Sequence, residues 1–151
     1  MTTNAAMEII AALFMDDIDT RSVPGPSTRI DIGGIQFSAP APAPVPCTIA
    51  PHLVVIVWAP PAEPGETPSS DAADTGAFGA LEVVFRTFGG DPDGEPLARN
   101  VQPLQIERGK FNYRLVRAEL VFDDYTTVVA HCRVDQGPVR LVPYTLLPPV
   151  S

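Results

Sequence analysis

The chain is 151 residues long, carries a formal net charge of −8, and is 45% hydrophobic and 19% charged. A soluble domain of this length buries roughly two-thirds of its unfolded surface, so one hydrophobic core is expected without disulfides or metal. The acidic balance would repel a phosphate backbone and Lys110 is the only lysine, which excludes nucleic acid from the expected partners.

Residues 1–5 resemble a loose tail, and residues 6–15 fit two structures. Helical spacing with Asn4 as a cap accounts for Met7, Ile10, Ala11 and Phe14, whereas the apolar run also fits a strand buried on both faces. The strand is favoured, because a lone helix would have to cover a sheet face that another sheet already covers.

The same apolar stretch is neither a secretory signal nor a membrane span. Glu8 precedes it and Asp16 and Asp17 follow it, where a signal peptide needs basic residues and a small-residue cleavage site. No apolar run approaches the ~18 residues of a membrane span. We therefore expect a cytoplasmic protein, or one carried inside a larger assembly, with Cys47 and Cys132 reduced.

Two neighbouring segments are marked by glycine and proline. Isoleucine and phenylalanine alternate over residues 29–37, and Gly33 and Gly34 interrupt the period, which predicts a β-bulge or a tight turn. Over residues 39–51, proline recurs at every second position from residue 40 to residue 46. Such a segment lacks alternate N–H donors, so it is expected to cross between sheets or to run along an edge.

From residue 53 onward one unit repeats, a short apolar run with β-branched residues at alternate positions that ends in turn residues. The runs are residues 53–58, 81–88, 113–122, 126–134 and 139–147. Strands of this length must pair and then stack on another sheet. The sequence predicts one all-β domain over residues 6–151, an antiparallel two-sheet β-sandwich of the Ig-like or C2-like kind with about seven to eight strands.

The connections between these runs differ in length. Residues 59–79 form an expected long flexible loop, since a connection of roughly 20 residues is uncommon in compact domains. Residues 89–96 predict a hairpin loop after residue 88. Asp123 and Asp124 are expected to join residues 113–122 and 126–134 as a hairpin.

Side-chain parity assigns the faces of that last hairpin. The expected core set is Val116, Ala118, Leu120, Phe122, Val128, Ala130, Cys132 and Val134. On the other face, Arg117 or Glu119 is expected opposite His131 or Arg133, in exposed cross-strand pairs.

Loop carboxylates provide a possible divalent-cation site, because Ca²⁺ takes about six to eight oxygen ligands. The candidates form three clusters in sequence, Asp16, Asp17 and Asp19, then Asp91, Asp93 and Glu95, and then Asp123 and Asp124. None of these clusters matches a calcium-loop pattern, and solvated turns explain them as well. No metal or other cofactor is therefore expected.

Cysteine and histidine supply zinc-ligand types at Cys47, His52, His131 and Cys132. His131 and Cys132 are neighbours in an expected strand, so their side chains point to opposite faces and do not share one ion. The same geometry opposes a Cys–His nucleophile pair, and the serines lie in proline-rich loops without a nucleophile elbow. The expected interpretation is a buried thiol and a surface imidazole.

The order of elements resembles a group of uncharacterised bacterial β-sandwich domains. The resemblance rests on the apolar segment at residues 8–16, the strand at residues 53–58, and residues 81–88 followed by Asp93, Gly94, Glu95 and Pro96. It spans most of the chain as a pattern, and it implies a fold but offers no catalytic residues to transfer.

Three functions follow as hypotheses. The first is a non-enzymatic interaction or structural module that acts within a protein assembly, of bacterial or phage type, with another protein as its partner. The second is a small-ligand or carbohydrate-binding domain with its site at the loop end near Trp58, and the third is a divalent-cation-dependent hydrolase. The candidate docking residues are Pro40, Pro42, Pro44, Pro46, Trp58, Pro60 and Pro61.

Overall fold

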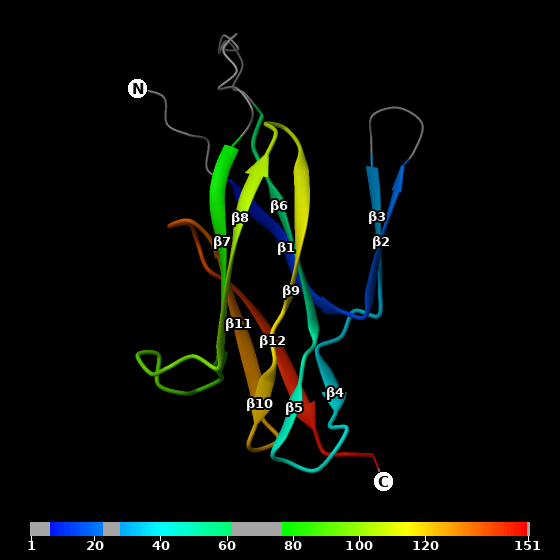
Figure 1. Cartoon of the computed structure of the whole chain (residues 1–151), viewed down its shortest axis with the longest axis vertical. Helices are drawn as coiled ribbons and strands as arrows, with labels where there is room; N and C mark the ends of the chain where they lie inside the picture. The colour runs from blue at the N-terminus through cyan, green and yellow to red at the C-terminus, as the bar shows by residue number, and fades with distance from the viewer. Residues whose placement is uncertain (1–6, 23–27, 62–76, 151) are drawn as a thin grey trace.

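The computed structural model describes residues 7–22, 28–61 and 77–150, and this part of the chain is all-β, with no helix (Figure 1). The strands are β1 (Glu8–Met15), β2 (Asp17–Ser22), β3 (Thr28–Gly33), β4 (Ser38–Pro40), β5 (Cys47–Ile49), β6 (His52–Trp58), β7 (Ala77–Thr87), β8 (Ala98–Ile106), β9 (Phe111–Arg117), β10 (Leu120–Phe122), β11 (Thr127–Val134) and β12 (Arg140–Leu147). The expected tail, residues 1–5, lies outside the described residues. The described residues form no helix, and so they contain no helix long and apolar enough to cross a membrane.

Hydrogen bonds group the described strands into a five-stranded sheet, β4-β12-β11-β7-β8, a three-stranded sheet, β1-β6-β9, and two-stranded ladders β10-β5 and β2-β3. The β10-β5 ladder continues β6-β9, since Leu120 opposite Ile49 and Arg117 opposite His52 belong to one register. Pro51 lies at the break and has no N–H to donate to a ladder. This interruption splits the predicted strand at residues 113–122, and β2, β4, β5 and β8 were not predicted as strands, which gives twelve described strands where about seven to eight were expected.

One hydrophobic core joins the two larger sheets. Leu53, Val55 and Val57 of β6 belong to the same buried cluster as Leu81, Val83 and Phe85 of β7. The rings of Phe14 in β1 and Tyr144 in β12 meet edge to face, with centroids 5.0 Å apart. No polar or charged residue of the described chain is buried. Burial of apolar surface from both layers therefore holds the fold together.

Side chains also connect the sheets at their edges. Gln102 Nε2 of β8 donates a hydrogen bond of 3.0 Å to the Leu115 carbonyl of β9. On another edge, Arg140 Nη2 of β12 donates to the Ile9 carbonyl of β1 at 3.0 Å. Long polar side chains thus bridge edges whose backbones do not pair, and they satisfy exposed strand carbonyls.

The favoured strand over residues 6–15 is confirmed, and the helical alternative is wrong. β1 pairs with β6, and a register shift between Ile9 and Ala11 places a bulge at Ile10. Ile9 and Phe14 face the core, whereas Ile10 is exposed. The strand interpretation prevails because β1 completes a sheet over the core.

The predicted hairpin between residues 113–122 and 126–134 is wrong. β10 pairs with β5, and β11 pairs with β12 and β7, so the turn at Asp123 and Asp124 crosses from one sheet to the other. The predicted core parity is nevertheless correct, because Val116, Leu120, Val128 and Cys132 are all buried. Arg117 lies opposite His52, so the expected charged cross-strand pairs are wrong as well.

Besides the short strands β4 and β5 in the proline-rich segment, two described strands were not predicted. β2 has Ile18 as its only apolar residue, so it lacks an alternating pattern, and it pairs with β3 in a hairpin that stands beside the main body in Figure 1. β8 follows the predicted 89–96 loop and pairs with β7. β7 begins at Ala77, inside the expected 59–79 loop, and residues 62–76 of that loop lie outside the described residues.

The proline-rich segment crosses between sheets, as the alternating prolines predict. β4 is the edge of the five-stranded sheet, parallel to β12, and Ala41 N donates to the Leu147 carbonyl at 2.8 Å. The chain then passes to β5 in the other layer, with a cis peptide bond at Val45–Pro46. Gly34, with φ of 68°, ends β3 ahead of this segment and marks the interruption predicted at Gly33 and Gly34.

Candidate functional site

The three-stranded sheet is apolar on the side that faces away from the core. Its rows place Trp58 beside Phe111, Ile56 beside Tyr113, and Val54 beside Leu115. On the β1 side, Ala11 and Leu13 continue the rows of Ile56 and Val54. We call this surface the outer apolar face, made of Ala11, Leu13, Val54, Ile56, Trp58, Phe111, Tyr113 and Leu115.

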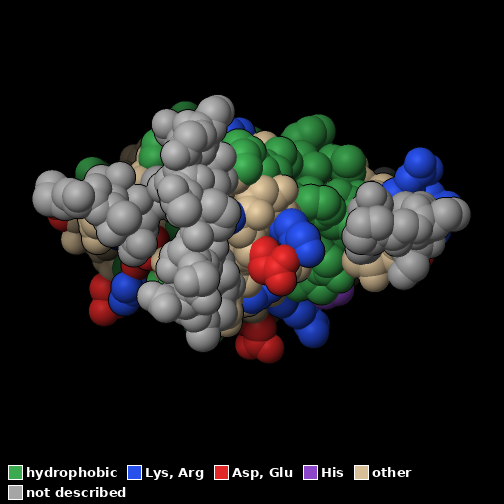
Figure 2. Space-filling model, turned by 90° about the horizontal axis from the view of Figure 1, so that it is seen from above, with side chains coloured by type: hydrophobic (Ala, Val, Ile, Leu, Met, Phe, Trp, Pro, Cys, Tyr) green, Lys and Arg blue, Asp and Glu red, His purple; other side chains and the backbone are tan. Residues whose placement is uncertain are grey.

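Several of these side chains are open to solvent. Phe111 and Leu115 on the edge strand β9 are 42% and 48% exposed, and Trp58 and Ile56 are half-buried. Figure 2 shows hydrophobic side chains gathered in one continuous area on the end of the molecule that carries the β8–β9 turn. A contiguous exposed apolar surface on a small domain is typical of an interaction site.

A pocket of about 630 Å³ lies on the outward side of the five-stranded sheet, under the loop between β7 and β8. Val129 forms its floor, between Arg86 of β7 and Pro143 of β12 in the same row. In the next row, His131 lies beside Leu141. We call this cavity the loop pocket.

The loop over this pocket is held by hydrogen bonds. Arg86 Nη1 donates to the Gly94 carbonyl at 2.7 Å, and Phe88 N donates to the Thr127 carbonyl at 2.8 Å. Asp91 Oδ1 accepts from Asp93 N at 2.9 Å, which closes a turn inside the loop. The pocket is therefore formed before any ligand arrives.

The loop pocket combines apolar walls with positive charge. No carboxylate is among the residues that line it. Burial, with the positive charge of Arg86 as the second cause, lowers the pKa of His131 from its ordinary value, so the imidazole is neutral at pH 7. The Arg86 guanidinium is then the one positive charge at that pH among the described lining residues.

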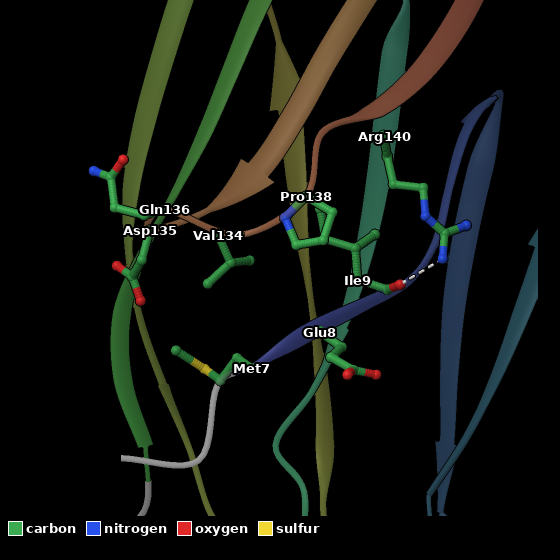
Figure 3. Close-up of a pocket in the computed structure, with 9 residues that line it drawn as sticks. Met7, Glu8, Ile9, Val134, Asp135, Gln136, Pro138 and Arg140 are labelled. Atoms are coloured by element: carbon green, nitrogen blue, oxygen red, sulfur yellow. Dashed lines mark hydrogen bonds between the residues drawn. The ribbon is translucent and has the colours of Figure 1, made fainter. Parts of the chain in front are cut away.

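A second pocket, of about 510 Å³, lies between the start of β1 and the β11–β12 turn. In Figure 3 the side chains of Met7 and Val134 point into it, and Gln136 points away. Asp135 lies at its rim in a left-handed conformation, with φ of 52°, and its Oδ1 accepts from Ala80 N at 2.9 Å. Met7 is the first described residue of the chain.

The candidate cation ligands lie in two separate places. Asp16, Asp17 and Asp19 lie at the β1–β2 junction and in β2, and Asp16 Oδ1 accepts from Gln36 Nε2 at 2.8 Å. Asp91 and Asp93 lie in the β7–β8 loop, on the opposite side of the molecule in Figure 1. Among the described residues, no group of three or more carboxylates, histidines or cysteines could hold a metal ion.

The cysteines and histidines are also dispersed. His131 lines the loop pocket, and its neighbour Cys132 points into the core, as strand alternation predicts. Burial raises the pKa of Cys132 to about 12, which keeps it a thiol. Cys47 lies in β5 opposite Phe122, and His52 is exposed at the start of β6.

The prolines singled out from the sequence are on the surface. Pro40, Pro42, Pro44 and Pro46 are exposed along the crossing segment. Pro61 is exposed and Pro60 is half-buried beyond the end of β6. Of the candidate docking residues, Trp58 alone belongs to the outer apolar face.

The sequence held a signal for one of these surfaces. In residues 53–58 both parities are apolar, which is typical of a strand covered on two sides. On the outward side Val54 is fully buried, and the face opens to solvent only toward Phe111 and Leu115 on the edge strand β9. The loop pocket had no such signal, because Arg86, Val129 and Pro143 come together only through the pairing order β7-β11-β12.

Comparison with protein-family models, with curated protein sequences and with solved structures found no match to this chain.

Proposed function

We propose that the protein is a non-enzymatic interaction module, which docks on another protein through the outer apolar face. The observation that carries the proposal is the run of apolar side chains on the outward side of β6 and β9, including Trp58, Phe111 and Leu115. Tryptophan and other aromatic residues concentrate binding energy at protein interfaces, where they are desolvated at the centre of the contact.

The rest of the architecture fits a docking scaffold. We interpret the two larger sheets around one core as a β-sandwich, interrupted at its prolines, that acts inside the cytoplasm or a larger assembly. The exposed prolines of the crossing segment give this scaffold a second, stiff contact surface with little entropy to lose. The outer apolar face remains the main contact in this proposal, because burial of aromatic surface contributes more free energy.

The test uses the exposed edge strand, where substitution leaves the core intact. A Phe111→Ser, Leu115→Ser double variant removes two large side chains from the outer apolar face. Val101→Ser is the matched control, because Val101 is 53% exposed on β8 in the other sheet. Each chain, purified at full length, is used to capture proteins from a lysate of the source cells, and light scattering records its own oligomeric state.

We expect one protein to be retained by the wild type and by Val101→Ser, and to be lost from the double variant. Retention by all three chains would contradict the proposal, as would capture by none of them. A homodimer that forms through the same face would overturn the assignment to a different partner, since the double variant alone would then be monomeric.

A further inference from the structure

We propose that the loop pocket binds a small molecule with one carboxylate group on an apolar, aryl or alkyl body. The site lies on the sheet opposite the outer apolar face, so it is separate from the docking surface proposed above. A ligand of this kind matches both features of the pocket, its apolar walls and its unbalanced positive charge.

The apolar part of the ligand has a defined place. Val129 is nearly buried at the floor, and Pro143 and Leu141 of β12 form one wall. Phe88, 73% exposed, stands at the start of the overhanging loop and offers a ring face or edge to an apolar body. A volume of about 630 Å³ is within the range of small-ligand sites.

The carboxylate has one partner of suitable charge and geometry. Arg86 donates Nη1 to the Gly94 carbonyl, and no other hydrogen bond or ion pair engages its guanidinium within the described chain. A planar guanidinium has five donors and matches a carboxylate with two parallel bonds. The bond to Gly94 fixes the side chain in place, so little entropy is lost when an anion binds.

Two nearby carboxylates have partners of their own, and the loop carboxylates of Asp93 and Glu95 do not line the pocket. Glu82, on the same face of β7, is bonded to Arg99 at 2.6 Å and to Arg133 at 3.3 Å. Asp91 closes its own turn and does not line the pocket. The local charge of the pocket, which has Arg86 and no carboxylate in its lining, favours an anionic ligand although the chain as a whole carries a net charge of −8.

Two probes of matched shape test the proposal, 4-phenylbutyrate and the neutral 4-phenylbutanamide. Each is titrated at pH 7 into the full ¹⁵N-labelled chain while backbone amide shifts are followed. We expect saturable shifts in β7, β11, β12 and the β7–β8 loop, with the carboxylate bound about tenfold more tightly than the amide. Equal affinity of the two probes, shifts confined to other surfaces, or no saturation up to about 10 mM would overturn the proposal.

Substitutions at Leu141 test whether the charge of the pocket determines its affinity for a carboxylate. Leu141 lines the pocket and is 61% exposed, so a polar side chain there does not disrupt the core. Leu141→Glu places a carboxylate in the pocket, and Leu141→Gln has nearly the same shape without charge. Relative to Leu141→Gln, we expect Leu141→Glu to bind 4-phenylbutyrate about tenfold more weakly and 4-phenylbutanamide equally. The same carboxylate affinity in both variants would contradict the role of charge.

Arg86→Gln completes the set, because it removes the positive charge and, with a side chain two bonds shorter, also withdraws the donor to the Gly94 carbonyl. Its amide-shift spectrum shows whether the loop is retained, and 4-phenylbutanamide reports on the apolar walls. We expect a loss of carboxylate affinity of about tenfold with amide affinity unchanged. Parallel loss of both affinities, with the loop intact, would overturn the assignment of Arg86.

Discussion

At the scale of single residues, Cys132 shows how strand alternation determines chemistry. From β11 the Cys132 side chain points into the core and the His131 side chain points to the outward side of the sheet. The alternation of side chains along a strand is enough to predict that the two groups lie on opposite faces. Burial raises the pKa of Cys132 from its ordinary value of 9.0 to about 12. The folded state therefore holds the thiol proton more tightly than the unfolded state does.

This linkage predicts a loss of stability at alkaline pH. Above pH 9 the unfolded chain ionises Cys132 while the folded chain keeps the proton, so the free energy of unfolding falls until the pH passes about 12. We expect Cys132→Ala to remove a slope of up to about 1.4 kcal/mol per pH unit relative to the wild type. Urea unfolding between pH 8 and about 10.5 measures the slope. The same slope in Cys132→Ala as in the wild type would contradict the prediction, and Cys47→Ala is the control.

A second residue-scale prediction concerns Gly79. A Cβ at this position would lie 2.6 Å from Asp135 Oδ2 and 2.6 Å from Met7 Cε. The Asp135 carboxylate would have to turn, which breaks its hydrogen bond from Ala80 N. We expect Gly79→Ala to lower the free energy of unfolding by about 1–2 kcal/mol, measured by urea denaturation.

The matched variant for this contact is Asp135→Asn. Asparagine keeps an acceptor for Ala80 N and tolerates the left-handed conformation at φ of 52°, whereas Asp135→Ala loses both advantages. We expect Asp135→Asn to stay within about 0.5 kcal/mol of the wild type and Asp135→Ala to lose about 1–2 kcal/mol. Equal losses in the two variants would show that neither the acceptor nor the backbone conformation matters.

At the scale of elements, the apolar runs predicted strands better than they predicted strand pairing. Residues 53–58 and 139–147 correspond closely to β6 and β12, because both alternate cleanly or are apolar throughout. The turn at Asp123 and Asp124 has the composition of a hairpin, but composition does not reveal whether the next strand pairs or changes sheet. β8 was missed because Asn100 and Gln102 occupy positions where its period would need apolar residues.

A second feature at this scale is the ion-pair cluster of Glu82, which links three strands of the five-stranded sheet. Its carboxylate joins β7 to Arg99 of β8 and to Arg133 of β11, and the hydrogen bond from Arg99 is the main cause that lowers the pKa of Glu82. A lowered carboxyl pKa stabilises the fold above the ordinary value of 4.5, and this contribution is lost as the pH falls through the lowered pKa.

We therefore expect Glu82→Gln to cost less than about 1 kcal/mol at pH 7, since the cluster is partly exposed and screened by salt. Below pH 4.5 the difference between the variant and the wild type should shrink, and urea unfolding at pH 7 and in acid measures both values. A difference that grows in acid would contradict the assigned sign. Glu107→Gln is a control for a surface pair, because the ion pair that Glu107 makes within the described residues is with Lys110.

At the scale of the whole molecule, composition and period predicted an all-β chain with its apolar residues in one core. They could not predict its two candidate sites equally well. The outer apolar face follows from a strand that is apolar on both sides, once the structure shows that its outward side opens to solvent toward the edge strand β9. The loop pocket depends on three strands and a loop that are distant in sequence, so only the fold brings Arg86 to Val129 and Pro143.

The central claim is that the outer apolar face contacts another protein, and site-specific photocrosslinking tests it most directly. A benzophenone amino acid is placed at Phe111 on this face or at Val101 on the other sheet, and the full chain is irradiated in its source cells. The account predicts a heavier adduct with a different protein from position 111 and none from position 101. No adduct from position 111, or an adduct made only of two copies of this chain, would contradict it.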